Sequence, residues 1–272
     1  MKRHQTMEPP YIFHPGYAPL LVSIPHAGTF IPEALRARLT PAAQPVPDTD
    51  WHLAQLYDFA KALGASILLA THSRYVVDLN RPPDNQNLYP GQDTTGLCPV
   101  DTFDKEALYQ DPADVPKAQE VEERKSIYWQ PYHDQLLREL KRLRSKFDQV
   151  VLWDAHSIRS VVPRFFDGRL PDMNLGTANG DSCASALANR LLSIGQASGY
   201  STVLNGRFKG GYITRHYGQP SRGIHAVQLE MTQITYMNEE PPFAYRPDRA
   251  HDVKPCLKAF LLAALEHTGH RP

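Results

Sequence analysis

The sequence predicts an α/β fold: a single three-layer domain built on a mixed, mostly parallel sheet. Segments with strand and helix patterns alternate along the 272 residues, without an internal repeat or a linker that would separate two domains. Two largely apolar stretches, residues 19–28 and 149–157, each contain a histidine near the end of the apolar run, and a third, 226–232, contains a carboxylate. Apolar runs without polar alternation are typical of strands buried on both faces, as in an α/β sheet.

The first half of the chain begins with a segment rich in Pro, His and Tyr. We expect this segment, residues 1–18, to be an irregular lead-in to a domain that covers residues 1–272. A helix is predicted near Trp51, because Leu53 and Leu56 have helical spacing and acidic residues precede them. The other elements predicted here are a strand over 19–25, a short helix from about Pro32, and strands over 66–71 and 75–79.

The second half opens with a long polar loop, residues 84–116, of a length that is usually functional or disordered. The main helical region follows over 117–147, and Pro131 is expected to kink or divide it near Gln130. The remaining predicted elements are a strand from residue 149, a short strand over 174–177, a helix over 183–197, strands over 201–204 and 224–231, and a helix over 252–267.

Composition excludes several classes of function. The 29 basic and 29 acidic residues balance, so no charge footprint for nucleic acid or an anionic membrane is evident. No apolar run approaches the ~20 residues that span a bilayer, and no signal peptide is visible. Cys98, Cys183 and Cys256 form neither a CxxC motif nor a disulfide framework. We therefore expect a soluble, cytoplasmic protein with reduced thiols.

The strand ends carry candidate metal ligands. His26 and His156 each follow an apolar strand, and ligands of open α/β sheets bind beyond the carboxyl ends of strands. Neutral imidazole is a common zinc ligand, although both histidines could instead cap strands through backbone hydrogen bonds. Asp48 and Asp50 are candidate carboxylate ligands or helix N-caps. Asp154, two residues before His156, faces the same side of the strand and could fix the imidazole tautomer.

Further polar residues are candidates for catalysis and substrate binding. Glu230 lies within an apolar strand, where a carboxylate needs either a structural ion pair or an active-site role such as moving a proton. Arg81, preceded by Asn80, and Arg215, in a Gly-flanked aromatic segment, suit bidentate recognition of carboxylates.

Several sequence blocks together carry a family resemblance. In chain order they are Ser23-Ile24-Pro25-His26-Ala27-Gly28, Asp48-Thr49-Asp50-Trp51, Asp78-Leu79-Asn80-Arg81-Pro82-Pro83-Asp84, Leu152-Trp153-Asp154-Ala155-His156-Ser157, Asn174-Leu175-Gly176-Thr177, Gly210-Gly211-Tyr212-Ile213-Thr214-Arg215-His216-Tyr217-Gly218 and Gln228-Leu229-Glu230-Met231. From about residue 10 to 265 the chain resembles the N-formylglutamate amidohydrolase (N-formylglutamate deformylase) family.

The resemblance implies hydrolysis of N-formyl-L-glutamate to L-glutamate and formate, the last step of a histidine-degradation route. It also implies a phosphorylase/hydrolase-like fold similar to zinc carboxypeptidases. By that relation His26 and His156 correspond to zinc ligands and Glu230 to the general base, while Arg81 with Asn80 resembles the group that holds a substrate carboxylate. The carboxypeptidase pattern has a Glu three residues after its first histidine, where this chain has Thr29.

The carboxylate ligand must therefore come from another segment, and we expect Asp50 rather than Asp48. Two rival functions stay open: a related zinc amidase acting on another N-acyl amino acid, and a non-catalytic protein that binds a small acid. Another divalent transition metal, such as cobalt or iron, could replace zinc. The oligomeric state does not follow from the sequence.

Overall fold

The computed structural model describes residues 8–270, in which seven strands form one mixed sheet of order β1-β3-β2-β4-β7-β5-β6. Neighbours run parallel from β3 through β2 and β4 to β7, and again from β5 to β6, whereas β1–β3 and β7–β5 are antiparallel. The strands are β1 (Tyr11–His14), β2 (Leu20–Ile24), β3 (Ser66–Ala70), β4 (Val150–Ile158), β5 (Met173–Gly176), β6 (Thr202–Leu204) and β7 (Ile224–Thr232). The predicted mixed, mostly parallel sheet is confirmed.

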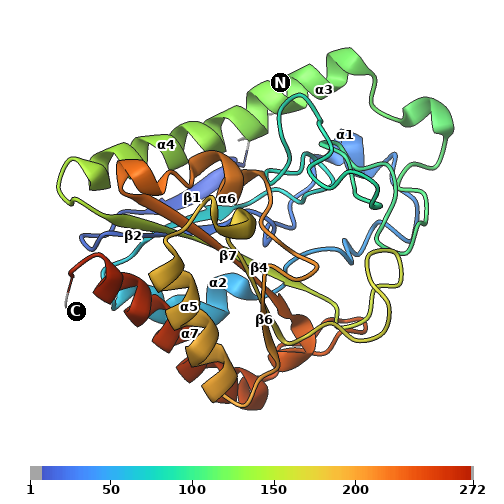
Figure 1. The fold of residues 1–272 in the computed structure, drawn as a ribbon. Helices are drawn as coiled ribbons and strands as arrows, with labels where there is room; N and C mark the ends of the chain where they lie inside the picture. The colour runs from blue at the N-terminus through green and yellow to red at the C-terminus, as the bar shows by residue number, and fades with distance from the viewer. Residues whose placement is uncertain (1–7, 271–272) are drawn as a thin grey trace.

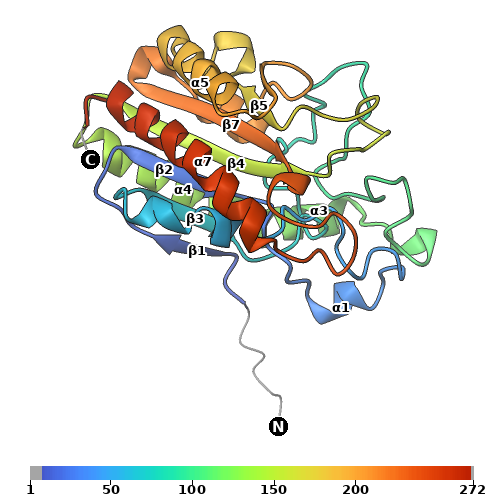
Figure 2. The same cartoon turned by 90° about the horizontal axis from the view of Figure 1, so that it is seen from below.

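Helices cover both faces of this sheet and make three layers (Figures 1 and 2). They are α1 (Glu33–Arg36), α2 (Leu53–Leu56), α3 (Ala118–Arg124), α4 (Gln130–Arg144), α5 (Ser185–Ala197), α6 (Tyr212–Tyr217) and α7 (Pro247–His267). Side chains of α4 and α6 share one buried apolar cluster, and those of α2, α5 and α7 share another. No helix within residues 8–270 is both long and apolar enough to cross a membrane.

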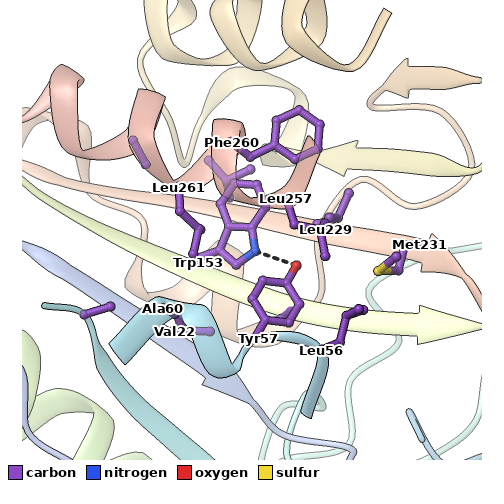
Figure 3. Close-up of a cluster of buried hydrophobic side chains, with 14 of the residues drawn as sticks. Val22, Leu56, Tyr57, Ala60, Trp153, Leu229, Met231, Leu257, Phe260 and Leu261 are labelled. Carbon is purple, nitrogen blue, oxygen red and sulfur yellow. Dashed lines mark hydrogen bonds between the residues drawn. The ribbon is translucent and has the colours of Figure 1, made fainter. Parts of the chain in front are cut away.

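The central strand β4 explains the uninterrupted apolar run. All nine of its residues are buried. Val151 and Trp153 point to the cluster that contains α5 and α7, while Leu152 points to the cluster that contains α4. Trp153 packs against Phe260 of α7, with ring centroids 5.8 Å apart, and its indole N–H donates to Tyr57 Oη over 3.1 Å (Figure 3). Truncating such a buried aromatic side chain to Ala costs about 3–5 kcal/mol.

Two local predictions are wrong. The lead-in is not irregular throughout, because Tyr11–His14 form β1, an edge strand paired with β3; residues 1–7 lie outside the described part of the chain. Residues 75–79 form turns instead of a strand. The backbone N–H of Asn80 donates to Asp78 Oδ1 over 2.9 Å, a local side-chain bond that competes with a strand ladder.

The main helical region is continuous but irregular at its middle. Between α3 and α4 it contains one π-helical turn, Lys125–Trp129. Pro131 follows in the first turn of α4, where its missing N–H cannot bond the carbonyl of Ile127. The predicted irregularity near Gln130 is therefore a π turn rather than a break.

Candidate active site

Three neighbouring strands bring polar side chains to one edge of the sheet. β2, β4 and β7 run parallel, and His156 of β4 is in register with Glu230 of β7. His26 follows the end of β2 by two residues. Because the carboxyl ends of parallel strands meet at one edge, these three side chains converge and line a single cavity.

Asp50 joins the two histidines in a compact buried group. Its backbone N–H donates to the His26 carbonyl oxygen over 3.0 Å, which ties the segment before α2 to the loop after β2. Oδ2 of Asp50 lies 3.1 Å from Nδ1 of His156 and 3.8 Å from Nδ1 of His26. One ligand atom from each of the three residues lies within 4.8 Å of the others.

A second carboxylate holds the other nitrogen of each imidazole. Nε2 of His26 lies 2.7 Å from Asp78 Oδ1, and Nε2 of His156 lies 3.1 Å from Asp154 Oδ2. An Nε2–H that donates to a carboxylate leaves the Nδ1 lone pair directed toward Asp50. Both imidazoles thus contact carboxylates, and the alternative in which they cap strands through backbone hydrogen bonds is wrong.

The electrostatics of this group favour a cation. Burial lowers the pKa of His26, against the opposing effect of Asp78. Burial also disfavours protonated His156, but Asp154 and Asp50 outweigh burial and raise its pKa well above the ordinary value. A buried site that draws a proton onto an imidazole has surplus negative charge, which a metal ion can neutralise.

The donor set fits zinc. Two imidazole nitrogens and one carboxylate oxygen are a usual protein contribution to a catalytic zinc site, with a fourth position for water. His26, Asp50 and His156 supply that set. Imidazole also accepts other first-row metals, so the donors alone do not select zinc over cobalt or iron.

Asp48 does not belong to the group formed by His26, Asp50 and His156. Its Oδ2 accepts from Tyr75 Oη over 2.6 Å and from the backbone N–H of Phe103 over 2.9 Å. Burial raises the pKa of Asp48 to about 6, against the Tyr75 hydrogen bond. These contacts tie the 84–116 loop to the segment before α2. Since α2 has no side-chain cap hydrogen bond, the N-cap alternative for Asp48 and Asp50 is wrong.

Glu230 is buried beside the His–Asp–His group. Among residues 8–270, Gln228 Nε2 donates a side-chain hydrogen bond to Glu230 Oε2 over 3.5 Å, and Glu230 forms no salt bridge. The structural ion-pair alternative is therefore wrong. Burial raises the pKa of Glu230 to about 8, with His156 opposing the shift. A carboxyl group that titrates near neutral pH is suited to taking up and returning a proton.

Asn80 and Arg81 lie on the wall of the same cavity. Asn80 Nδ2 lies 3.0 Å from His156 Nε2, and its Oδ1 accepts from the Ile213 backbone N–H over 2.8 Å. Arg81 Nε donates to the Thr95 carbonyl oxygen over 2.8 Å, and Nη2 donates to Thr95 Oγ1 over 3.1 Å. The loop at Thr95 therefore fixes the guanidinium at the cavity.

Arg215, unlike Asn80 and Arg81, is not among the described residues that line the cavity. It belongs to α6. Its Nε donates to the Gly210 carbonyl oxygen over 2.8 Å, and its guanidinium carbon lies 5.2 Å from the Tyr89 ring centroid. Arg215 therefore packs against Tyr89, and of these two residues Tyr89 is the one that lines the cavity.

Sequence reasoning missed three residues of the site. Asp78 lies behind His26, and Arg74 and Arg207 line the cavity. Arg74 Nη2 donates to Asp78 Oδ2 over 2.6 Å. The spacing of four residues is a sequence signal for an ion pair, but it does not show that the pair is buried at a site. Arg207 belongs to a loop with no recognisable motif, so no comparable signal existed.

Comparison with known protein families identifies the family of this chain. The model of the family described as N-formylglutamate amidohydrolase matches residues 18–237. The chain belongs to the N-formylglutamate amidohydrolase family. The matched segment contains every residue of the site described above, from His26 to Glu230, and the resemblance inferred from the sequence blocks is confirmed.

Curated relatives support membership of the N-formylglutamate amidohydrolase family, and two solved structures have the same fold. An N-formylglutamate deformylase of Pseudomonas putida is 53% identical over 260 residues, 95% of this chain and 97% of that protein. One from Pseudomonas aeruginosa is 53% identical over 254 residues, 93% and 95% of the two chains. An N-formylglutamate amidohydrolase of Ralstonia eutropha JMP134 has a TM-score of 0.81 at 21% identity, covering 96% of this chain and 99% of that one. A gene product of Agrobacterium tumefaciens has a TM-score of 0.74 at 18% identity and 97% coverage of both chains, so the fold is shared.

Proposed function

We propose that this member of the family hydrolyses N-formyl-L-glutamate to L-glutamate and formate with the help of a zinc ion. The observation that carries the proposal is the buried group of His26, Asp50 and His156 beside Glu230, in a cavity lined by arginines. The two relatives that are 53% identical are both named N-formylglutamate deformylase, which supports the choice of substrate.

We assign His26, Asp50 and His156 as the metal ligands. Asp78 and Asp154 keep the two imidazoles in the tautomer that offers Nδ1 to the metal. A bound zinc ion would lower the pKa of its water and polarise the formyl oxygen. Asp50 is preferred over Asp48, because Asp48 Oδ2 is occupied by the Tyr75 hydroxyl.

Glu230 is assigned as the general base. It takes a proton from the attacking water while the water oxygen forms a bond to the formyl carbon. The carbon–nitrogen bond then breaks, and Glu230 returns the proton to the leaving nitrogen. Formate and the free amino group of L-glutamate result. Gln228, whose Nε2 lies 3.5 Å from Glu230 Oε2, holds the carboxylate in position.

Both carboxylates of the substrate need partners, because a desolvated carboxylate without one is costly. We assign Arg81 and Asn80 to the α-carboxylate. That carboxylate is attached to the carbon that bears the scissile nitrogen, and Asn80 contacts His156. The contact expected between Arg215 and a substrate carboxylate stays a prediction, since Arg215 packs on the Tyr89 ring and is not among the described residues that line the cavity.

The reaction would be the last step of a histidine-degradation route in the cytoplasm. Both the pathway and the location rest on the family resemblance. The balanced charge of the chain, 29 basic against 29 acidic residues, is consistent with a small-molecule substrate and with the absence of a nucleic-acid or membrane partner.

Formate release tests this proposal. The purified protein should release formate from N-formyl-L-glutamate but little acetate from N-acetyl-L-glutamate. Removal of the metal by a chelator should abolish release, and added Zn²⁺ should restore it. If the zinc-loaded protein released no formate from N-formyl-L-glutamate, the proposed reaction would be ruled out. If protein that is metal-free by metal analysis were fully active, the proposed role of the metal would be ruled out.

A further inference from the structure

Three guanidinium groups line the cavity, and Arg207 is the one without a carboxylate partner among residues 8–270. Arg74 Nη2 lies 2.6 Å from Asp78 Oδ2, and Arg81 Nη1 lies 4.0 Å from the same oxygen. Arg207 instead donates from Nε to the Phe165 carbonyl oxygen, and its Nη1 is buried without a hydrogen-bond partner. A positive charge and an unmet donor therefore remain at this wall of the cavity.

Aromatic rings enclose the Arg207 guanidinium without satisfying it. Its central carbon lies 5.2 to 5.8 Å from three ring centroids, those of Tyr89, Phe165 and Phe208. Burial lowers its pKa. Cation–π contacts offset part of the desolvation but offer no oxygen pair to the guanidinium fork. Asp93, the nearby acid at the cavity, is already paired with Arg164 at 2.9 Å and Lys105 at 3.1 Å.

The position of Arg207 suits the far end of the proposed substrate. The scissile amide must lie at Glu230 and the histidines, and the α-carboxylate one carbon away at Arg81. The side-chain carboxylate is two methylene groups further. Phe165 and Phe208 line the same cavity beside Arg207, so apolar surface for those methylenes leads to a guanidinium that lacks an anion.

We propose that Arg207 binds the side-chain carboxylate of the substrate and so selects N-formyl amino acids with an acidic side chain. The proposal rests on the proposed function and deepens it. Arg207 is the specificity-determining residue in this account, and it takes no part in the chemical step.

Two substrates of nearly equal size test the assignment: N-formyl-L-glutamate and N-formyl-L-glutamine, whose side chains differ in charge. Formate release is measured with the zinc-loaded parent, Arg207→Gln, Arg207→Lys and the control Arg190→Gln, which removes an exposed arginine of α5. Arg207→Gln should lower kcat/KM for N-formylglutamate by about 30- to 3,000-fold, the scale for truncating one partner of a buried charged pair. The loss should appear mainly in KM.

The same variant should change kcat/KM for N-formylglutamine by less than about threefold, because no charged pair is lost there. Arg207→Lys, which keeps the charge but not the fork, should retain part of the preference for glutamate. Arg190→Gln should match the parent on both substrates.

Equal losses on the two substrates in folded Arg207→Gln and Arg207→Lys would overturn the proposal and make Arg207 a structural residue of the loop. Unchanged kinetics in both variants would overturn it as well. Failure of the proposed function is a separate result: the parent itself would then release no formate from N-formylglutamate.

Discussion

At the scale of single residues, the site is defined by carboxylates that enclose two imidazoles. Asp50 lies on the Nδ1 side of both rings, and Asp78 and Asp154 lie on their Nε2 sides. Asp78 stays ionised, because the charge of Arg74 and the hydrogen bond from His26 outweigh its burial and hold its pKa well below the ordinary value. Burying so many charges is costly unless they are paired, and a metal ion at the Nδ1 atoms would supply the missing pairing.

Glu230→Gln separates proton transfer from metal and substrate binding. The amide is nearly isosteric with the carboxylate but cannot take up a proton. We expect kcat to fall by about 10²–10⁴, the usual contribution of general acid–base catalysis. Zinc content and KM should stay close to the parental values, because Glu230 is not among the residues assigned as ligands.

Steady-state kinetics with metal analysis of the same preparation measures this effect. A folded Glu230→Gln protein with near-parental kcat would show that another group moves the proton. Loss of zinc from this variant would instead make Glu230 part of the metal site.

At the scale of elements, the buried strands were predictable and the connections were not. β2, β4 and β7 are buried over almost their whole length because helices cover both faces of the sheet, so they are rich in apolar residues and can be recognised in the sequence. The short edge strand β1 has alternating burial and only four residues, and its position depends on pairing with β3. Residues 75–79 have strand-like composition, but their turns are stabilised by contacts with distant segments, such as Asp78 N–H to Leu97 O at 2.7 Å.

The start of α6 shows how an element positions the site. Gly211 precedes Tyr212, and its N–H donates to Gln228 Oε1 over 2.7 Å. A Cβ at this position would lie 2.4 Å from Asn80 Nδ2. Its φ of −85° is open to any residue, so the constraint is steric rather than conformational. The glycine allows α6 to pack directly against the Asn80 side chain that contacts His156.

Gly211→Ala should therefore displace Asn80 and lower kcat/KM by about 10²-fold, the scale of a 1 Å misplacement in an active site. The control His216→Ala changes an exposed residue of the same helix and should stay within about threefold of the parent. Formate-release kinetics and thermal melting of both variants provide the measurement. Parental kcat/KM in Gly211→Ala would mean that the Asn80 contact can shift without consequence.

At the scale of the whole molecule, the sheet edge unites residues that are far apart in the sequence. Strand patterns revealed His26, His156 and Glu230, since a histidine after an apolar run and a carboxylate within an apolar strand are local signals. Arg74 and Arg207 could not be found in this way. Their positions depend on how loops fold over the cavity, and a guanidinium on a loop looks the same in sequence whether it faces solvent or a substrate.

The metal content of the parent and of His156→Ala tests the central claim most directly. His156 is buried, and its Nδ1 lies 3.1 Å from Asp50 Oδ2, so its removal takes one of three protein donors from the proposed ion. After equilibration with Zn²⁺ and removal of excess metal, the parent should retain one equivalent of zinc. A folded His156→Ala protein should retain almost none and release no formate. One full equivalent of zinc in that variant would contradict the assigned metal site.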